Sequence, residues 1–157
     1  MSKTTPATQA LTKAGIAFGL AHYDYDPNAE RVGLQAAEAM GVAPAEVFKT
    51  LMAELDGKPI CAIVPSDEEV NMKKLAAALG GKSAQMMKPA DAERLTGYKV
   101  GGISPLGQRR AVPTALDELA TLYDEIFLNG GQRGLQIRIR PADLVAALNC
   151  VTADLVR

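Results

Sequence analysis

The residue types that most often build metal sites and nucleophilic active sites are scarce in this chain. Its 157 residues include one histidine, two cysteines and no tryptophan. Cys61 and Cys150 are far apart and form no CxxC pair, so neither a zinc cluster nor a disulfide framework is expected. The sequence also contains no HExxH and no DxDxDG motif. We therefore expect no metal and no cofactor.

Long apolar runs are missing as well. No stretch approaches the ~18 apolar residues needed to span a bilayer. The N-terminus does not combine a basic start with an apolar run and a small-residue cleavage site. These absences predict a cytoplasmic protein without membrane contact. Because 48% of the residues are apolar, the chain can bury one sizeable core, and we expect a single domain over residues 1–157.

The net charge of −1 conceals an uneven distribution of charged residues. Residues 1–70 carry 5 Lys/Arg against 10 Asp/Glu, whereas residues 71–140 carry 11 against 6. A basic second half suits a phosphate-bearing partner such as nucleic acid. The solvated faces of ordinary helices would give the same count, so charge alone leaves both interpretations open.

Apolar periodicity and turn residues predict helices interspersed with β-hairpins. The expected helices cover about residues 6–14, 34–40, 72–79, 89–95 and 141–148, and the expected strands cover about 16–20, 47–54, 60–64, 98–100, 125–128 and 135–139. Asp56-Gly57 and the segment 129–134 provide the turns of two hairpins. This order indicates a mixed α/β or α+β domain in which helices flank a partly antiparallel, curled or barrel-like sheet.

Residues 101–107, with the sequence GGISPLG, form the segment best suited to approach a ligand closely. Glycines leave backbone N–H groups uncovered, so the segment is expected to hold a phosphate, a ribose or an oxyanion, or to be a tight turn only. Ser104 resembles the serine of a nucleophile elbow, but the second glycine of that motif is absent and Pro105 follows. Ser104 is therefore a poor candidate for a nucleophile.

Lys49 is the most unusual charged residue in the sequence. It has the same parity as Val47, Leu51 and Ala53 in a predicted strand, and those neighbours mark that face as buried. Either the aliphatic stem carries the ammonium group to the edge of the sheet, or the lysine lines a cleft and meets an anionic or carbonyl-bearing ligand. The residues alone give these two interpretations equal weight.

Two further segments are candidate pocket walls. Tyr23 and Tyr25 lie close together in a polar segment after the first strand, as in a binding wall or in ordinary edge packing. The segment 129–134 is first of all a hairpin turn, and a second pocket wall is the alternative. The single histidine, His22, is interpreted as a surface or hydrogen-bonded residue in preference to a general base.

Several motifs in combination resemble the bacterial YbaK-type aminoacyl-tRNA deacylases. The motifs are FKTL at 48–51, LTGY at 95–98, VGGISPLGQRR at 100–110 and GGQRGL at 130–135. The segment YDYDP at 23–27 and the helix LAAALG at 75–80 extend the likeness nearly from end to end. This family is related to the editing domain inserted in bacterial prolyl-tRNA synthetases. The resemblance implies a mixed α/β fold around a barrel-like sheet.

The resemblance also implies a function and a set of site residues. It implies hydrolytic clearance of mischarged tRNA, most often cysteine on proline tRNA, with the tRNA acceptor end and prolyl-tRNA synthetase as partners and no metal. Lys49 would be the essential lysine, and Gly101 and Gly102 would offer backbone N–H groups to the ester. The other substrate-binding residues would be Thr50, Ile103, Ser104, Pro105, Tyr23, Val32, Asn129, Gly131 and Gln136.

The family mechanism explains why no convincing nucleophile is found. The substrate's own cysteine thiolate is thought to attack its ester carbonyl, which forms a thiolactone and releases the tRNA. Three residues differ from the best-known members, which have Phe, Ser and Asp where this chain has Val32, Asn129 and Gln136. The resemblance therefore does not determine which amino acid is removed. Deacylation of alanine or serine esters is one alternative function. A non-catalytic module that binds tRNA or a nucleotide is the other.

Overall fold

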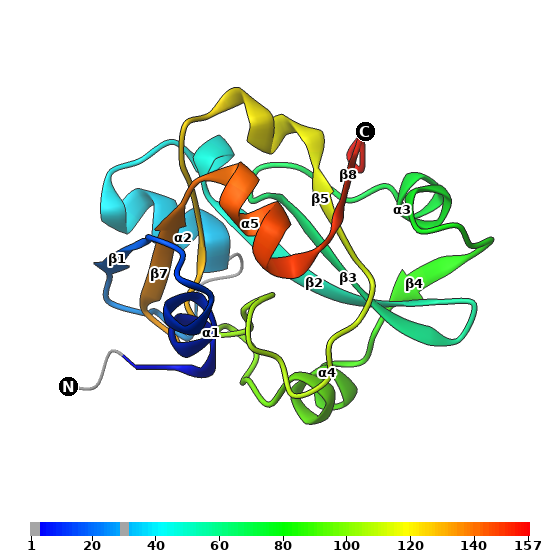
Figure 1. Cartoon of the computed structure of the whole chain (residues 1–157), viewed down its shortest axis with the longest axis horizontal. Coiled ribbons are helices and arrows are strands. Elements are labelled where there is room, and N and C mark those ends of the chain that lie inside the picture. The colour runs from blue at the N-terminus through cyan, green and yellow to red at the C-terminus, as the bar shows by residue number, and fades with distance from the viewer. Residues whose placement is uncertain (1–3, 29–31) are drawn as a thin grey trace.

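Two β-sheets form the framework of the molecule (Figure 1). The computed structural model describes residues 4–28 and 32–157. One sheet has the strand order β1 (Gly19–His22), β7 (Leu135–Ile139), β6 (Ile126–Asn129), and the other has the order β4 (Ala84–Met86), β2 (Phe48–Leu55), β3 (Lys58–Pro65), β5 (Thr114–Asp117), β8 (Val151–Ala153). The α-helices are α1 (Pro6–Ala14), α2 (Val32–Met40), α3 (Met72–Ala78), α4 (Pro89–Thr96) and α5 (Pro141–Leu148), and the short 3₁₀ helices are η1 (Pro44–Glu46) and η2 (Glu118–Leu122).

The pairing of the strands confirms a mixed α+β fold with a partly antiparallel sheet. All pairs in the three-stranded sheet are antiparallel, as are β4 with β2 and β2 with β3. The pairs of β3 with β5 and of β5 with β8 are parallel. Both predicted hairpins form, since β2 joins β3 through Asp56-Gly57 and β6 joins β7 through residues 130–134.

The sheets of this barrel-like fold do not close into a complete barrel. Within the described part of the chain the two sheets are linked only by a bridge between Val47 and Phe127, just before β2. A closed barrel gives every strand two neighbours, whereas here β4 and β8 end one sheet and β1 and β6 end the other. The sheets instead meet at one corner and enclose a common core.

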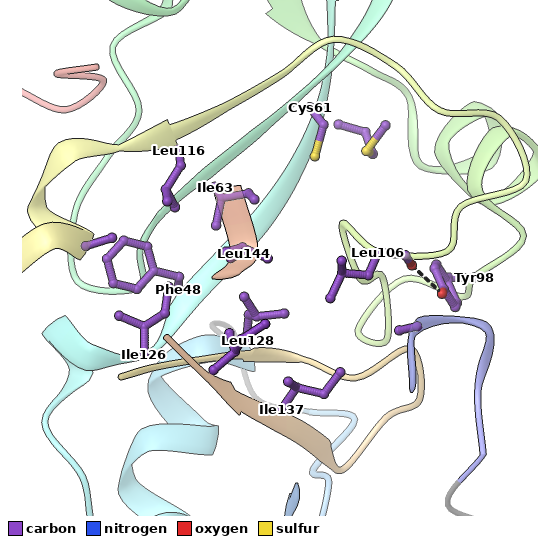
Figure 2. Close-up of a cluster of buried hydrophobic side chains, with 14 of the residues drawn as sticks. Phe48, Cys61, Ile63, Tyr98, Leu106, Leu116, Ile126, Leu128, Ile137 and Leu144 are labelled. Atoms are coloured by element: carbon purple, nitrogen blue, oxygen red, sulfur yellow. Dashed lines mark hydrogen bonds between the residues drawn. The ribbon is translucent and has the colours of Figure 1, made fainter. Parts of the chain in front are cut away.

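That core explains why β2 and β3 are strongly apolar. Phe48 and Ile63 point into the main core between the sheets, together with apolar residues of β5, β6, β7 and α5 (Figure 2). Ala62 and Val64 face the other way and pack in a second cluster with Leu75 of α3. Strand β3 is therefore buried on both faces, as a central strand should be.

The structure corrects the expected strand at residues 98–100. The Tyr98 hydroxyl donates to the Leu106 carbonyl over 2.6 Å, and the Gly102 amide donates to the Lys99 carbonyl over 2.8 Å. These bonds bend the segment into a loop before it can pair with a sheet. The first strand also lies later than expected, at Gly19–His22.

Three short strands, β4, β5 and β8, were not predicted. Strands β5 and β8 pair in parallel with strands that lie far away along the chain. Such pairs are not joined by a hairpin turn, so no local turn motif predicts them. In the described residues, none of the α-helices has the length and apolar character needed to cross a membrane.

Thr5 joins the N-terminal helix to the second hairpin, and its replacement tests this contact. Its hydroxyl accepts from the Thr8 amide over 3.1 Å and donates to the Gly130 carbonyl over 2.6 Å. We expect Thr5→Ala to lower the free energy of unfolding by about 1–2 kcal/mol, because both bonds are buried. Urea denaturation measures this, with Thr12→Ala as the control on an exposed position of α1. Equal losses in the two variants would contradict the assignment.

Candidate active site

A pocket opens where the first residues of β2 meet the loop 99–107 and the ends of β6 and β7. Its cavity volume is about 160 Å³. The lining residues are Gly33, Val47, Phe48, Lys49, Thr50, Val100, Gly101, Ile103, Asn129 and Gln136. Six of them are residues that the sequence predicts for the substrate site: Lys49, Thr50, Gly101, Ile103, Asn129 and Gln136. Four separate segments thus bring these six together.

Lys49 and Thr50 reach the pocket because they lie near the beginning of β2. Lys49 pairs with Val64 and is half-buried, and Thr50 pairs with Ile63. Alternation along the strand directs the two side chains to opposite faces. Both side chains nevertheless line the pocket, because it lies at the corner where the two sheets meet. Of the two interpretations of Lys49, the structure favours the cleft-lining one.

Asn129 connects the second hairpin to the glycine-rich loop. It stands directly opposite Gln136 in the β6–β7 ladder, so both side chains lie on one face of the sheet. Its Nδ2 donates to the Gly101 carbonyl over 3.0 Å, and its Oδ1 accepts from the Gly131 amide over 2.7 Å. The amide of Asn129 therefore holds the loop at the pocket while it shapes the turn after β6.

Three buried polar atoms near this site have no hydrogen-bond partner among the described residues. They are Thr50 Oγ1, Gln136 Oε1 and the Tyr23 hydroxyl. Gln136 is 3% exposed, and both Gln136 and Thr50 line the pocket, so they are candidates for contact with a polar ligand. Burial raises the pKa of Tyr23 above its usual value. Gln136 lies near enough to the phenol to oppose that shift.

Five other predicted site residues lie outside the described lining of this pocket. Ser104 is fully buried, and its hydroxyl accepts from the Leu106 amide over 3.2 Å, so it shapes the loop. Pro105 lines a different hollow, between α1 and α5. Gly102 is buried beneath the 132–133 turn, and Gly131 lies against Tyr98. Tyr23 is buried behind the pocket. Val32 is the first residue of α2, and its side chain lies outside the described part of the chain.

Some residues that line the pocket were not predicted from the sequence. Val47 and Phe48 were assigned to the core, and Gly33 had no signal beyond its place near a helix. Val100 is apolar but 43% exposed, and this unusual exposure is visible only in the structure. Among the described residues, no group of three or more His, Cys, Asp or Glu side chains has the arrangement of a metal site.

Comparisons with known proteins give a consistent result. A family model described as "Aminoacyl-tRNA editing domain" matches residues 26–147. A protein of Enterococcus faecalis named "Putative Cys-tRNA(Pro)/Cys-tRNA(Cys) deacylase EbsC" is 37% identical over 120 residues, which cover 76% of this chain and 73% of that protein. The "Multifunctional Ser/Thr-tRNA deacylase ProXp-y" of Escherichia coli is 28% identical over 68% of this chain and 67% of its own length.

A solved structure resembles the whole of the described fold. It is described as that of "a putative trans-editing enzyme for prolyl tRNA synthetase", has a TM-score of 0.84 and is 25% identical to this chain. The match covers 99% of both chains.

The neighbouring amides Asn129 and Gln136 provide a test that separates a structural residue from a ligand-binding one. We expect Asn129→Leu to lower the free energy of unfolding by about 1–3 kcal/mol, because it leaves two backbone groups unpaired. Gln136→Met should leave that free energy unchanged or raise it, because it removes a buried oxygen without a partner. Urea denaturation of both variants measures the difference. A large loss in Gln136→Met would show that Gln136 stabilises the fold instead.

Proposed function

We propose that this chain, which belongs to the aminoacyl-tRNA editing domain family and is an aminoacyl-tRNA deacylase, removes cysteine from mischarged proline tRNA. The supporting observation is the pocket that joins Lys49 to the loop at Gly101 and to the unpartnered oxygen of Gln136. The acceptor end of the tRNA is the partner that this chemistry requires. Prolyl-tRNA synthetase is the proposed source of tRNA selection.

The proposed mechanism uses the nucleophile of the substrate. The cysteine thiolate attacks the ester carbonyl, so that a C–S bond forms and the bond from the carbonyl carbon to the ribose oxygen breaks. The ribose oxygen takes up the proton that the thiol lost, and the products are a thiolactone and free tRNA. The protein needs only to hold the ester in the reactive geometry and to stabilise negative charge.

Four residues of the pocket have a defined part in this mechanism. Lys49 places positive charge beside the thiolate and the developing oxyanion. Gly101 has a φ of +90°, and a Cβ atom built on it would lie 2.6 Å from the Tyr25 hydroxyl, so only glycine brings the backbone this close. Asn129 holds that glycine in place, and Gln136 Oε1 accepts from a donor group of the aminoacyl moiety.

A second substrate preference is also supported by an observation. The unpartnered oxygens of Thr50 and Gln136 suit an alcohol side chain as well as a thiol. A relative, the Escherichia coli protein, is named for activity on Ser-tRNA and Thr-tRNA. A serine or alanine ester would need an activated water molecule, because intramolecular attack by a thiol is then impossible.

The role of Lys49 is tested by its removal. We expect Lys49→Ala to slow the release of cysteine from proline tRNA by at least about 100-fold while thermal unfolding is unchanged within a few degrees, because the charge acts mainly in the transition state. Lys58→Ala, an exposed lysine at the start of β3, is the matched control and should keep full activity. Undiminished release by Lys49→Ala would overturn the proposed site.

The amino-acid preference is tested by comparing esters on the same tRNA. Proline tRNA is charged with cysteine, serine or alanine, and release is followed over time with catalytic amounts of protein. We expect cysteine to be released fastest and alanine at least about 100-fold more slowly, because alanine has no internal nucleophile. Faster release of serine would favour the second preference. Binding without turnover of any ester would favour a non-catalytic module, and its binding would weaken steeply with salt.

A further inference from the structure

Tyr25 and Arg133 form a stacked pair at the rim of the pocket that the mechanism does not use. The Arg133 guanidinium carbon lies 5.3 Å from the centre of the Tyr25 ring, which is the geometry of a cation–π contact. Tyr25 follows β1, whereas Arg133 belongs to the turn between β6 and β7. The two residues meet beside Val100 and Gly101, which both line the pocket.

Direct contacts join the pair to the loop. Arg133 Nε donates to the Val100 carbonyl over 2.9 Å. The Tyr25 hydroxyl occupies space that a side chain at position 101 would need. A Cβ atom at Gly102 would lie 2.9 Å from the Arg133 amide nitrogen, so the turn and the loop are in close backbone contact. Both residues are therefore in direct contact with the loop.

The surface around this pair has the composition of a site for unpaired nucleic acid. Arg133 and Lys99 are exposed, Tyr25 is half-buried, and Val100 exposes 43% of its surface. Proteins bind splayed-out bases on aromatic rings and on guanidinium planes, and they bind the adjoining phosphates with lysine or arginine. An exposed aliphatic side chain, a stacked ring and a guanidinium therefore meet at this rim, and Lys99 is the preceding residue of the loop.

We propose that the Tyr25–Arg133 pair is a stacking platform for a nucleobase of the unpaired 3′ end of the tRNA, with Lys99 beside its phosphate. This inference rests on the proposed function, because it assumes an RNA substrate whose ester enters the pocket. The platform supplies affinity for the single-stranded end and sets the distance from which the ester reaches Lys49. Recognition is by stacking and charge, so any base is accepted at this point.

The experiment measures binding of an uncharged RNA minihelix with the proline-tRNA acceptor stem, with and without its unpaired 3′ nucleotides. Fluorescence anisotropy with the full chain gives both dissociation constants. We expect the 3′ end to strengthen binding by about 10-fold in the unmodified protein, as one stacked base does. Arg133→Leu and Tyr25→Leu should abolish that gain, and Tyr25→Phe should keep it because the ring remains.

Two further variants separate stacking from charge. Arg138→Leu removes an exposed arginine of β7 that pairs with Glu125, and it should keep the gain from the 3′ end. Arg133→Lys keeps the charge but loses the planar group, and it should lose most of the gain. Thermal unfolding identifies any variant that fails to fold. A gain that survives in folded Arg133→Leu and Tyr25→Leu would overturn the proposal, as would equal losses in Arg133→Leu and Arg138→Leu.

The result is independent of the test of the proposed function. Release of cysteine by the unmodified protein, together with a 3′-end gain that the Arg133 and Tyr25 variants retain, would refute the platform alone. A gain that depends on Tyr25 and Arg133 in a protein that releases no amino acid would refute the proposed reaction alone.

Discussion

The site depends on one hydrogen-bonded side chain, Asn129. Its amide joins the Gly101 carbonyl to the Gly131 amide, and so it connects the loop after α4 to the hairpin of the three-stranded sheet. The corner where the two sheets meet supplies the start of β2, and with it Lys49. A second bond, from Arg133 Nε to the Val100 carbonyl over 2.9 Å, joins the same loop to the same hairpin. The pocket is therefore a product of tertiary structure, although its residues are recognisable in the sequence.

The parts of the fold that could be predicted are those with local signals. The β2–β3 and β6–β7 hairpins formed as expected because a turn and two apolar strands are adjacent in the chain. Strands β5 and β8 depend on parallel partners from distant segments, and the sequence carries no local mark of such pairing. The expected strand at 98–100 failed because hydrogen bonds from Tyr98 and Gly102 bend it. The mixed α+β fold with a barrel-like sheet was expected, and the edge strands show that the sheets do not close into a complete barrel.

The same distinction applies to the site. The parity of Lys49 marked it as unusual, and the glycines marked the loop. Ser104 looked available from its sequence context, but its hydroxyl is used inside the loop to hold Leu106. The contact between Tyr25 and Arg133 joins residues from distant segments, so no spacing rule reveals it. The unpartnered oxygens of Thr50 and Gln136 are visible only in three dimensions, and they indicate that the pocket is prepared for a polar ligand at a cost in stability.

The central claim is that the protein supplies position and charge while the substrate supplies the nucleophile. The most direct measurement compares proline tRNA charged with cysteine and with S-methylcysteine, which is larger by one methyl group and has no free thiol. The account predicts rapid release of cysteine, with thiolactone as the first product, and release of S-methylcysteine no faster than spontaneous hydrolysis. Comparable enzymatic release of the two amino acids would contradict it, because water or a protein group would then be the nucleophile.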